Sequence, residues 1–164
     1  MLKILYVCLG NICRSPIAEG IMQNLISEKG ISNKILVDSA GTADYHIGKL
    51  PDQRTRHNAE NHGITLTHKC RQLSFQDFSD FDYIVAMDQN NLDNINLLSL
   101  RAFGNYQLEE NVFLLRKFDN EDNEKNVPDP YYGTKDDFES VFQIANRCNK
   151  VFLDWLAERH NFVV

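Results

Sequence analysis

Short apolar runs alternate with amphipathic segments along this chain of 164 residues. The runs are rich in β-branched and aromatic residues, whereas the segments after them repeat apolar side chains at the period of a helix. The predicted strands are 4–7, 35–37, 83–87 and 112–115. Because parallel strands joined by helices are covered on both faces, the pattern predicts an α/β fold with a parallel sheet between two helix layers.

The same pattern predicts four helices. They extend from Pro16 to Gly30, from about Asp52 to Gly63, through residues 92–98 and through residues 138–156. Pro16 suits a first helical position, and Gly30 suits a helix end because glycine readily adopts the left-handed conformation found there. The last helix is the clearest, because its apolar residues keep the helical period over about five turns.

Length and composition predict one domain, residues 1–164, in a reducing cytoplasm. The length is close to the roughly 150 residues of a typical domain, and 43% apolar with 24% charged residues is ordinary for a globular protein. Four cysteines are too few for a disulfide scaffold and lack zinc-finger spacing. The N-terminal apolar run, residues 4–9, is too short for a signal peptide, and no run approaches the roughly 20 residues that span a bilayer, so we expect no membrane association.

The net charge of −6 argues against a nucleic-acid partner, because such proteins neutralise phosphates with a basic face. The charges are nevertheless unevenly distributed. Residues 1–71 contain nine Lys and Arg against six Asp and Glu, whereas residues 72–164 contain eight against seventeen. An anion site is therefore expected in the first part of the chain.

The segment between the first strand and the first helix has the composition of a phosphate-binding loop with a nucleophile. It consists of Cys8, Leu9, Gly10, Asn11, Ile12, Cys13, Arg14 and Ser15. Ligands bind at this position in open α/β sheets, where the N–H groups of the turn and of the helix N-terminus attract an anion. The same field stabilises a thiolate, so we expect Cys8 to be a nucleophile. Arg14 can hold two phosphoryl oxygens and Ser15 can donate to the sulfur; the alternative is a buried strand-end cysteine beside an arginine that caps a turn.

A leaving group needs an acid, and Asp129 is the main candidate. It lies in the segment 128–133, whose two prolines and glycine exclude regular structure and restrict the loop. The alternative is that Asp129 only forms a turn. Asp88, after the third strand, competes by position, but it equally suits the N-cap of the following helix, and we favour the cap.

Two motifs at opposite ends of the chain, residues 7–16 and 129–132, closely resemble those of the low-molecular-weight protein tyrosine phosphatases. Further matches are Asp38-Ser39-Ala40-Gly41, Tyr45, His62-Gly63-Ile64, His68, Arg71-Gln72, Phe81-Asp82-Tyr83-Ile84 and Met87-Asp88. The resemblance covers nearly the whole chain. It implies a flavodoxin-like, three-layer fold in which four parallel strands have the order 2-1-3-4.

By this resemblance, Cys8 attacks the phosphorus of a phosphotyrosine and forms a cysteinyl-phosphate, while Arg14 and the loop amides hold the phosphoryl oxygens. Asp129 protonates the departing phenolate and then acts as base on the water that hydrolyses the intermediate. Ser15 stabilises the thiolate as it leaves. The implied partners are phosphotyrosine proteins, with no cofactor and no metal, and we expect a monomer with weak self-association at most.

The resemblance also assigns residues that support the loop. Asn11 shapes it, since asparagine tolerates the left-handed conformation, and its expected hydrogen-bond partners are His68 and Ser39. The alternative for His68 is a surface histidine. Cys13 is implied to form a reversible disulfide with Cys8 that protects the thiolate from oxidation; otherwise it is a small buried apolar side chain.

Pocket depth and walls are expected to select the substrate. A thiolate at the floor of a pocket reaches phosphorus on a long phenyl arm more readily than on a short serine arm. By the resemblance, Tyr45 and Tyr131 flank the ring of the substrate. The alternative for Tyr131 and Tyr132 is packing against the last helix.

Two other functions fit parts of the pattern. An arsenate reductase on the same fold would pass oxidation from Cys8 to cysteines after the start of the third strand, but residues 71–147 contain none. A phosphocysteine carrier protein would hold phosphate in a similar loop, but Arg14 and the Asp-Pro-Tyr-Tyr segment of residues 129–132, here called the acid loop, argue against it. Cys70 has no assigned role, and Cys148 lies on the apolar face of the last helix, so we expect both to be structural.

Overall fold

Four parallel strands form the centre of the computed structural model, which describes residues 1–105 and 110–164. The strands are β1 (Leu2–Cys8), β2 (Ile35–Gly41), β3 (Tyr83–Ala86) and β4 (Val112–Leu114). Their order is β2-β1-β3-β4 and every pair is parallel, so the predicted fold class and strand order are confirmed.

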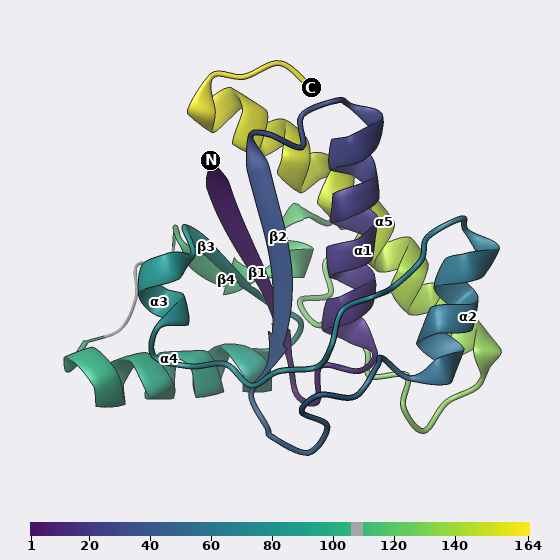
Figure 1. Cartoon of the computed structure of the whole chain (residues 1–164), viewed down its shortest axis with the longest axis horizontal. Helices are drawn as coiled ribbons and strands as arrows, with labels where there is room; N and C mark the ends of the chain where they lie inside the picture. Colours follow the sequence, from purple (N-terminus) through teal and green to yellow (C-terminus); the bar gives the residue numbers. More distant parts are fainter. Residues whose placement is uncertain (106–109) are drawn as a thin grey trace.

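Helices cover both faces of the sheet. They are α1 (Arg14–Glu28), α2 (Gln53–Asn61), α3 (Asp77–Asp80), α4 (Gln89–Phe103) and α5 (Lys135–His160), with a 3₁₀ turn, η1, at Leu115–Phe118. Figure 1 shows α1, α2 and α5 on one side of the strands and α3 and α4 on the other. Alternate residues of β1 supply both cores, because Ile4 and Tyr6 pack with α1 and α5 whereas Leu5 and Val7 pack with α4. Among the described residues, no helix combines the length and apolar character needed to cross a membrane.

Four helices differ from the prediction, and one of them is α4, which extends beyond 92–98 at both ends. α1 begins at Arg14, so Pro16 occupies its third position rather than its first; this costs no hydrogen bond because the first N–H groups of a helix have no intrahelical acceptor. α5 extends beyond 138–156 and begins with a capping box between Thr134 and Asp137. α3 was not predicted, since four polar-flanked residues are too few to show a helical period.

The carboxyl end of the sheet brings distant segments together. β1 delivers Cys8 to this end, between the ends of β2 and β3. The chain returns to the same place after η1, where Val127 is buried and its N–H donates to Met87 O at 2.8 Å. The segment that carries Asp129 is therefore attached beside the loop that carries Cys8.

Candidate active site

Residues 8–15 form the phosphate loop, whose conformation depends on the backbone of Asn11. The φ angle of Asn11 is 55°, the left-handed conformation that the sequence predicted. Four loop carbonyls accept hydrogen bonds from surrounding segments at 2.8–2.9 Å: Cys8 O from Thr42 N, Leu9 O from Ala43 N, Asn11 O from Cys70 Sγ, and Ile12 O from Asp52 N. These bonds turn the carbonyls away from the loop centre, as anion binding by the loop N–H groups requires.

The phosphate loop packs closely against the end of β2. A Cβ at Gly41 would lie 2.8 Å from Leu9 O, closer than such contacts occur, and would also be tight against Ala43 O at 3.1 Å and Asn11 N at 3.2 Å. Glycine at this position therefore permits the contact between β2 and the loop.

Cys8 is buried at the floor of the loop with two polar groups directed at its sulfur. Asn11 N donates to Sγ at 3.3 Å, and Ser15 Oγ lies 3.0 Å from Sγ. Ser15 Oγ already accepts a hydrogen bond from Asn11 Nδ2 at 2.9 Å, so its own hydrogen can be donated, either to the sulfur at 3.0 Å or to Ala40 O at 3.4 Å, and the sulfur is the nearer acceptor. Donors at the sulfur stabilise the thiolate form.

Arg14 lies beside Cys8 with its side chain 4% exposed and three acceptors around its guanidinium. Nη1 donates to Asp88 Oδ2 at 2.5 Å and to Val127 O at 3.2 Å, and Nη2 donates to Asp129 Oδ2 at 2.9 Å. Burial opposes the charge of Arg14, but the Cys8 sulfur and the two carboxylates outweigh burial and raise its pKa. The guanidinium is therefore held as a fixed cation beside the nucleophile.

Asp88 serves both the helix and the site. The expected N-cap is confirmed, since Asp88 Oδ1 accepts from Asn91 N at 2.7 Å. The contact of its other oxygen with Arg14 was not predicted. Its position after β3, the neighbour of β1, is the signal that would have indicated it, because adjacent parallel strands end side by side.

A pocket of about 350 Å³ opens above Cys8. Its lining consists of Cys8, Leu9, Gly10, Ile12, Cys13, Arg14, Tyr45, His46, Asp129, Tyr131 and Tyr132. The acid candidate and both predicted wall tyrosines thus meet the loop at one cavity. Tyr132 is 97% exposed, so the alternative that it packs against the last helix is wrong; Tyr131 is 40% exposed and lines the pocket. His46 and Tyr132 were not predicted as lining residues, and only their positions next to Tyr45 and Tyr131 pointed to them.

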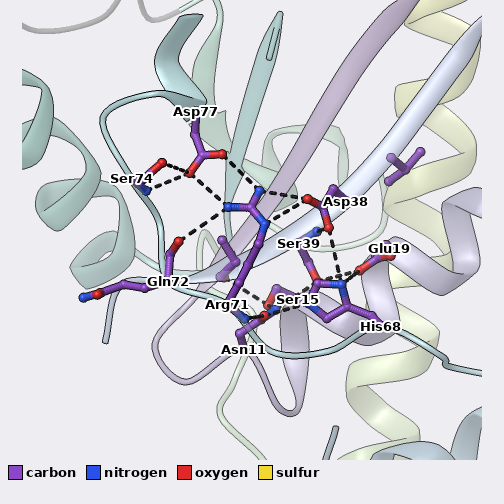
Figure 2. A network of polar contacts seen from close by, with 12 residues as sticks. Asn11, Ser15, Glu19, Asp38, Ser39, His68, Arg71, Gln72, Ser74 and Asp77 are labelled. Atoms are coloured by element: carbon purple, nitrogen blue, oxygen red, sulfur yellow. Dashed lines mark hydrogen bonds and ion pairs between the residues drawn. The ribbon is translucent and has the colours of Figure 1, made fainter. Parts of the chain in front are cut away.

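A polar network behind the phosphate loop fixes Asn11 (Figure 2). Asn11 Nδ2 also donates to Ser39 Oγ at 2.9 Å, and Asn11 Oδ1 accepts from Arg71 N at 2.9 Å. Because a backbone N–H can only donate, Arg71 sets the orientation of the amide. His68 Nε2, 2.8 Å from Oδ1, is then also a donor. Both expected partners of Asn11 are present, and His68 is largely buried, so the alternative of a surface histidine is wrong.

The far side of His68 faces two carboxylates. Its Nδ1 lies 3.4 Å from Glu19 Oε2 and 3.3 Å from Asp38 Oδ1. Burial raises the pKa of Glu19 against the effects of His68 and Ser39, whereas His68 and Arg71 overcome burial and lower the pKa of Asp38.

The side chains of Glu19, Asp38 and His68 bring ligand atoms within 4.8 Å of one another, a spacing that could hold a metal ion. Ser39 Oγ donates to Glu19 at 2.6 Å, and the Arg71 fork contacts Asp38 at 2.8–2.9 Å. The existing donors thus already satisfy these carboxylates. Figure 2 shows Arg71 continuing the network to Asp77. No pattern in the sequence indicated this extension.

The other cysteines are buried and free. Burial raises the pKa of Cys13 to about 12 and that of Cys70 to about 11, so both thiols are protonated. Cys70 has a place that the sequence did not reveal, because its thiol donates to Asn11 O at 2.8 Å. Cys148 is fully buried in the core beside α1, in agreement with a structural role.

Comparisons with known proteins match this chain and its fold over almost the full length. A family model described as low molecular weight phosphotyrosine protein phosphatase matches residues 3–161. The human low molecular weight phosphotyrosine protein phosphatase is 42% identical over 152 residues, which cover 93% of this chain and 94% of the human protein.

Solved structures give the same result. A protein tyrosine phosphatase from Entamoeba histolytica superposes with a TM-score of 0.88 at 34% identity, covering 98% of this chain and 99% of that one. A Drosophila arginine phosphatase superposes with a TM-score of 0.87 at 30% identity, covering 94% and 97%. With a family model and relatives that span nearly all of it, the chain belongs to the low molecular weight phosphotyrosine protein phosphatase family.

Proposed function

We propose that this phosphatase hydrolyses phosphotyrosine in protein substrates through a phosphocysteine at Cys8, without a metal ion. The convergence of Cys8, Arg14 and Asp129 at one pocket carries the proposal, because the last two are 115 residues apart in the chain and form a direct ion pair. That trio supplies a nucleophile, a fixed cation for the phosphoryl oxygens and an acid.

In the first step the Cys8 thiolate attacks phosphorus in line, and the bond between phosphorus and the phenolic oxygen breaks. Arg14 and the loop N–H groups stabilise the charge on the equatorial oxygens. A phosphoryl group held by Arg14 competes with Asp129 for Nη2, which releases the carboxyl group toward the leaving oxygen. Asp129 enters this step protonated, as the second step leaves it, and gives its proton to that oxygen.

In the second step Asp129 takes a proton from water as the water oxygen attacks phosphorus. The bond between sulfur and phosphorus breaks, inorganic phosphate leaves, and the thiolate of Cys8 returns. The hydrogen bond from Ser15 and the N–H of Asn11 stabilise this leaving thiolate.

Pocket shape favours phosphotyrosine over phosphoserine. Cys8 is buried at the floor of the pocket, and Tyr45 and Tyr131 line its sides. A phosphate therefore reaches the sulfur only when a long side chain separates it from the backbone of the substrate. Phosphoarginine also has a long arm, and the Drosophila relative is an arginine phosphatase. Aromatic walls favour an aryl group, so we place phosphotyrosine first.

The experiment is turnover of p-nitrophenyl phosphate and of a phosphotyrosine peptide in the presence of a metal chelator. Cys8→Ser is expected to abolish turnover of both substrates, and Asp129→Ala to slow turnover of the phosphotyrosine peptide, whose phenolate needs a proton, by roughly 100-fold or more. Acid quenching should trap phosphate on Cys8 only transiently, whereas a phosphocysteine carrier would accumulate it. Activity that needs a metal and survives Cys8→Ser would contradict the proposal, as would thiol-dependent arsenate reduction as the main activity.

We further propose that residues 1–164 act as one domain and as a monomer in the cytoplasm. All four cysteines are free, and the core on each face of the single sheet draws on segments from both halves of the chain. Sedimentation at micromolar concentration would test the monomer, and localisation of a tagged chain would test the compartment.

A further inference from the structure

The beginning of α2 forms a bridge between the phosphate loop and the loop that carries Asp129. Asp52, the N-cap of α2, donates its N–H to Ile12 O at 2.8 Å and so attaches the helix to the phosphate loop. Arg54 forms a bidentate ion pair with Asp52, in which Nε donates to Oδ1 at 3.0 Å and Nη2 donates to Oδ2 at 2.9 Å.

The other end of the bridge lies on the acid loop. Arg54 Nη1 donates to Tyr131 O at 2.9 Å. The N–H of Tyr131 in turn donates to Asp129 Oδ1 at 3.1 Å. The peptide groups on the two sides of Tyr131 therefore connect Arg54 to the acid.

Two aromatic rings hold the guanidinium of Arg54 in this position. Its central carbon lies 4.6 Å from the ring centre of Phe138, in the first turn of α5, and 5.5 Å from that of Tyr131. A forked pair with a carboxylate fixes the plane of an arginine, and ring contacts restrict it further. Nη1 is thus presented to Tyr131 in a preset direction although the side chain is partly exposed.

We propose that Arg54 is a positioning residue that keeps Asp129 over the leaving oxygen during proton transfer. The inference rests on the proposed function, which supplies the role of Asp129. The Asp129 side chain is 46% exposed, and its hydrogen bonds within the described part of the chain are with Arg14 and with Tyr131 N. Once Arg14 binds a phosphoryl group, Asp129 keeps its hydrogen bond from Tyr131 N, and Arg54 holds Tyr131 in place through the bond to Tyr131 O.

The test compares kcat/KM for two esters that differ in their need for an acid. Phenolate is a poor leaving group and requires a proton, whereas p-nitrophenolate leaves with little help. Arg54→Met is expected to lower kcat/KM about tenfold with phenyl phosphate and less than about twofold with p-nitrophenyl phosphate, a fraction of the roughly 100-fold or greater effect of an acid. In an Asp129→Ala background, Arg54→Met should cause no further loss.

Arg159→Met is the matched control. Arg159 is 41% exposed against 42% for Arg54, pairs with Glu110 at 2.7 Å and lies 5.1 Å from the Trp155 ring centre, but it is at the opposite end of α5. Both rates should be unchanged in this variant. The inhibition constant of inorganic phosphate should also be unchanged in Arg54→Met, because the phosphate loop keeps its own contacts.

Three results for Arg54→Met would each overturn the role of Arg54. They are an equal loss of kcat/KM with the two esters, the same loss in the Asp129→Ala background as in the unaltered protein, and a rise in the inhibition constant of phosphate that matches the loss of kcat/KM. Absence of chelator-resistant aryl phosphatase activity in the unaltered protein would instead overturn the proposed function. The two failures are therefore distinguishable in one set of assays.

Discussion

At the scale of single residues, Asn11 joins the phosphate loop to the network behind it. One amide donates to Ser15 and Ser39 and accepts from His68 and from the N–H of Arg71. Every one of these groups is buried or partly buried, so water does not readily replace the amide. The conformation of the loop and the support of the nucleophile thus depend on the same side chain.

Replacing Asn11 by alanine should therefore be costly. Each net hydrogen bond contributes about 1 kcal/mol, and a left-handed alanine costs about 1–2 kcal/mol. We expect Asn11→Ala to lower the free energy of unfolding by about 5 kcal/mol and to reduce kcat/KM, as measured by urea denaturation and p-nitrophenyl phosphate turnover. Asn24→Ala removes one exposed hydrogen bond within α1 and is the control. A loss of less than 1 kcal/mol in Asn11→Ala would contradict the central role of the amide.

Asp88 allows its two contacts to be separated. Asparagine is as good an N-cap as aspartate, so Asp88→Asn should keep the bond to Asn91 N and change stability by less than about 1 kcal/mol. It removes the charge that faces Arg14, and a displaced guanidinium should lower kcat/KM by about 10- to 100-fold. Asp88→Ala should lose the activity and about 1 kcal/mol of stability as well. Wild-type activity in Asp88→Asn would mean that Asp88 is only a cap.

At the scale of elements, the approach of β2 to the phosphate loop is set by Gly41. A methyl group there would lie 2.8 Å from Leu9 O and 3.1 Å from Ala43 O, and both of these atoms belong to the backbone. We expect Gly41→Ala to cost about 1–3 kcal/mol of stability, as overpacking does, and to weaken inhibition by vanadate because the loop is displaced. Denaturation and vanadate competition measure the two effects. Unchanged inhibition together with lower stability would show that the loop keeps its shape while β2 moves.

The elements themselves were largely predictable, because strands and long helices carry their own periodic pattern. The contacts between loops could not be predicted from such a pattern. Residues 62–76 have no period, so nothing local shows that His68, Cys70 and Arg71 would reach Asn11. For His68 only the family resemblance gave the contact. Arg54 is a similar case, since its bond to Tyr131 joins residues 77 positions apart.

At the scale of the whole molecule, the uneven charge has a structural explanation. The phosphate loop and Arg14 lie in the basic first part, and the acidic second part contributes Asp88 and Asp129, which both contact Arg14. A net charge of −6 is thus compatible with a phosphate site, because anion binding here is local. The strand order, which sets β3 beside β1, brings the two parts together.

The acid loop also depends on a distant ion-pair cluster around Asp119. Arg147 of α5 donates to both oxygens of Asp119 at 2.8 and 2.9 Å, and Arg116 Nε donates at 2.9 Å. Arg116 also donates to Asn126 O at 3.0 Å, directly before Val127. Hydrogen bonds from Arg147 first, and then from Glu121 N and Arg116, outweigh burial and lower the pKa of Asp119 to about 2.

This shift makes stability depend on pH in a definite direction. The pKa of Asp119 in the folded protein lies below the ordinary 3.8, so its contribution is fully present above about pH 5 and is lost as pH falls toward 2. A shift of this size corresponds to about 2 kcal/mol. We expect Asp119→Asn to lower the free energy of unfolding by about that amount at pH 6, measured in urea.

The difference between Asp119→Asn and the unaltered protein should shrink as the pH is lowered to 3. Asp154→Asn, on the exposed side of α5, is the control, and its unfolding free energy should follow that of the unaltered protein. A difference that stays constant with pH would mean that Asp119 acts through packing and neutral hydrogen bonds rather than charge. In that case protonation of Asp119 would leave its hydrogen bonds from Arg147 of α5 intact. Unfolding at low pH would then not begin at this cluster, and the segment that carries Asp129 would not be released by it.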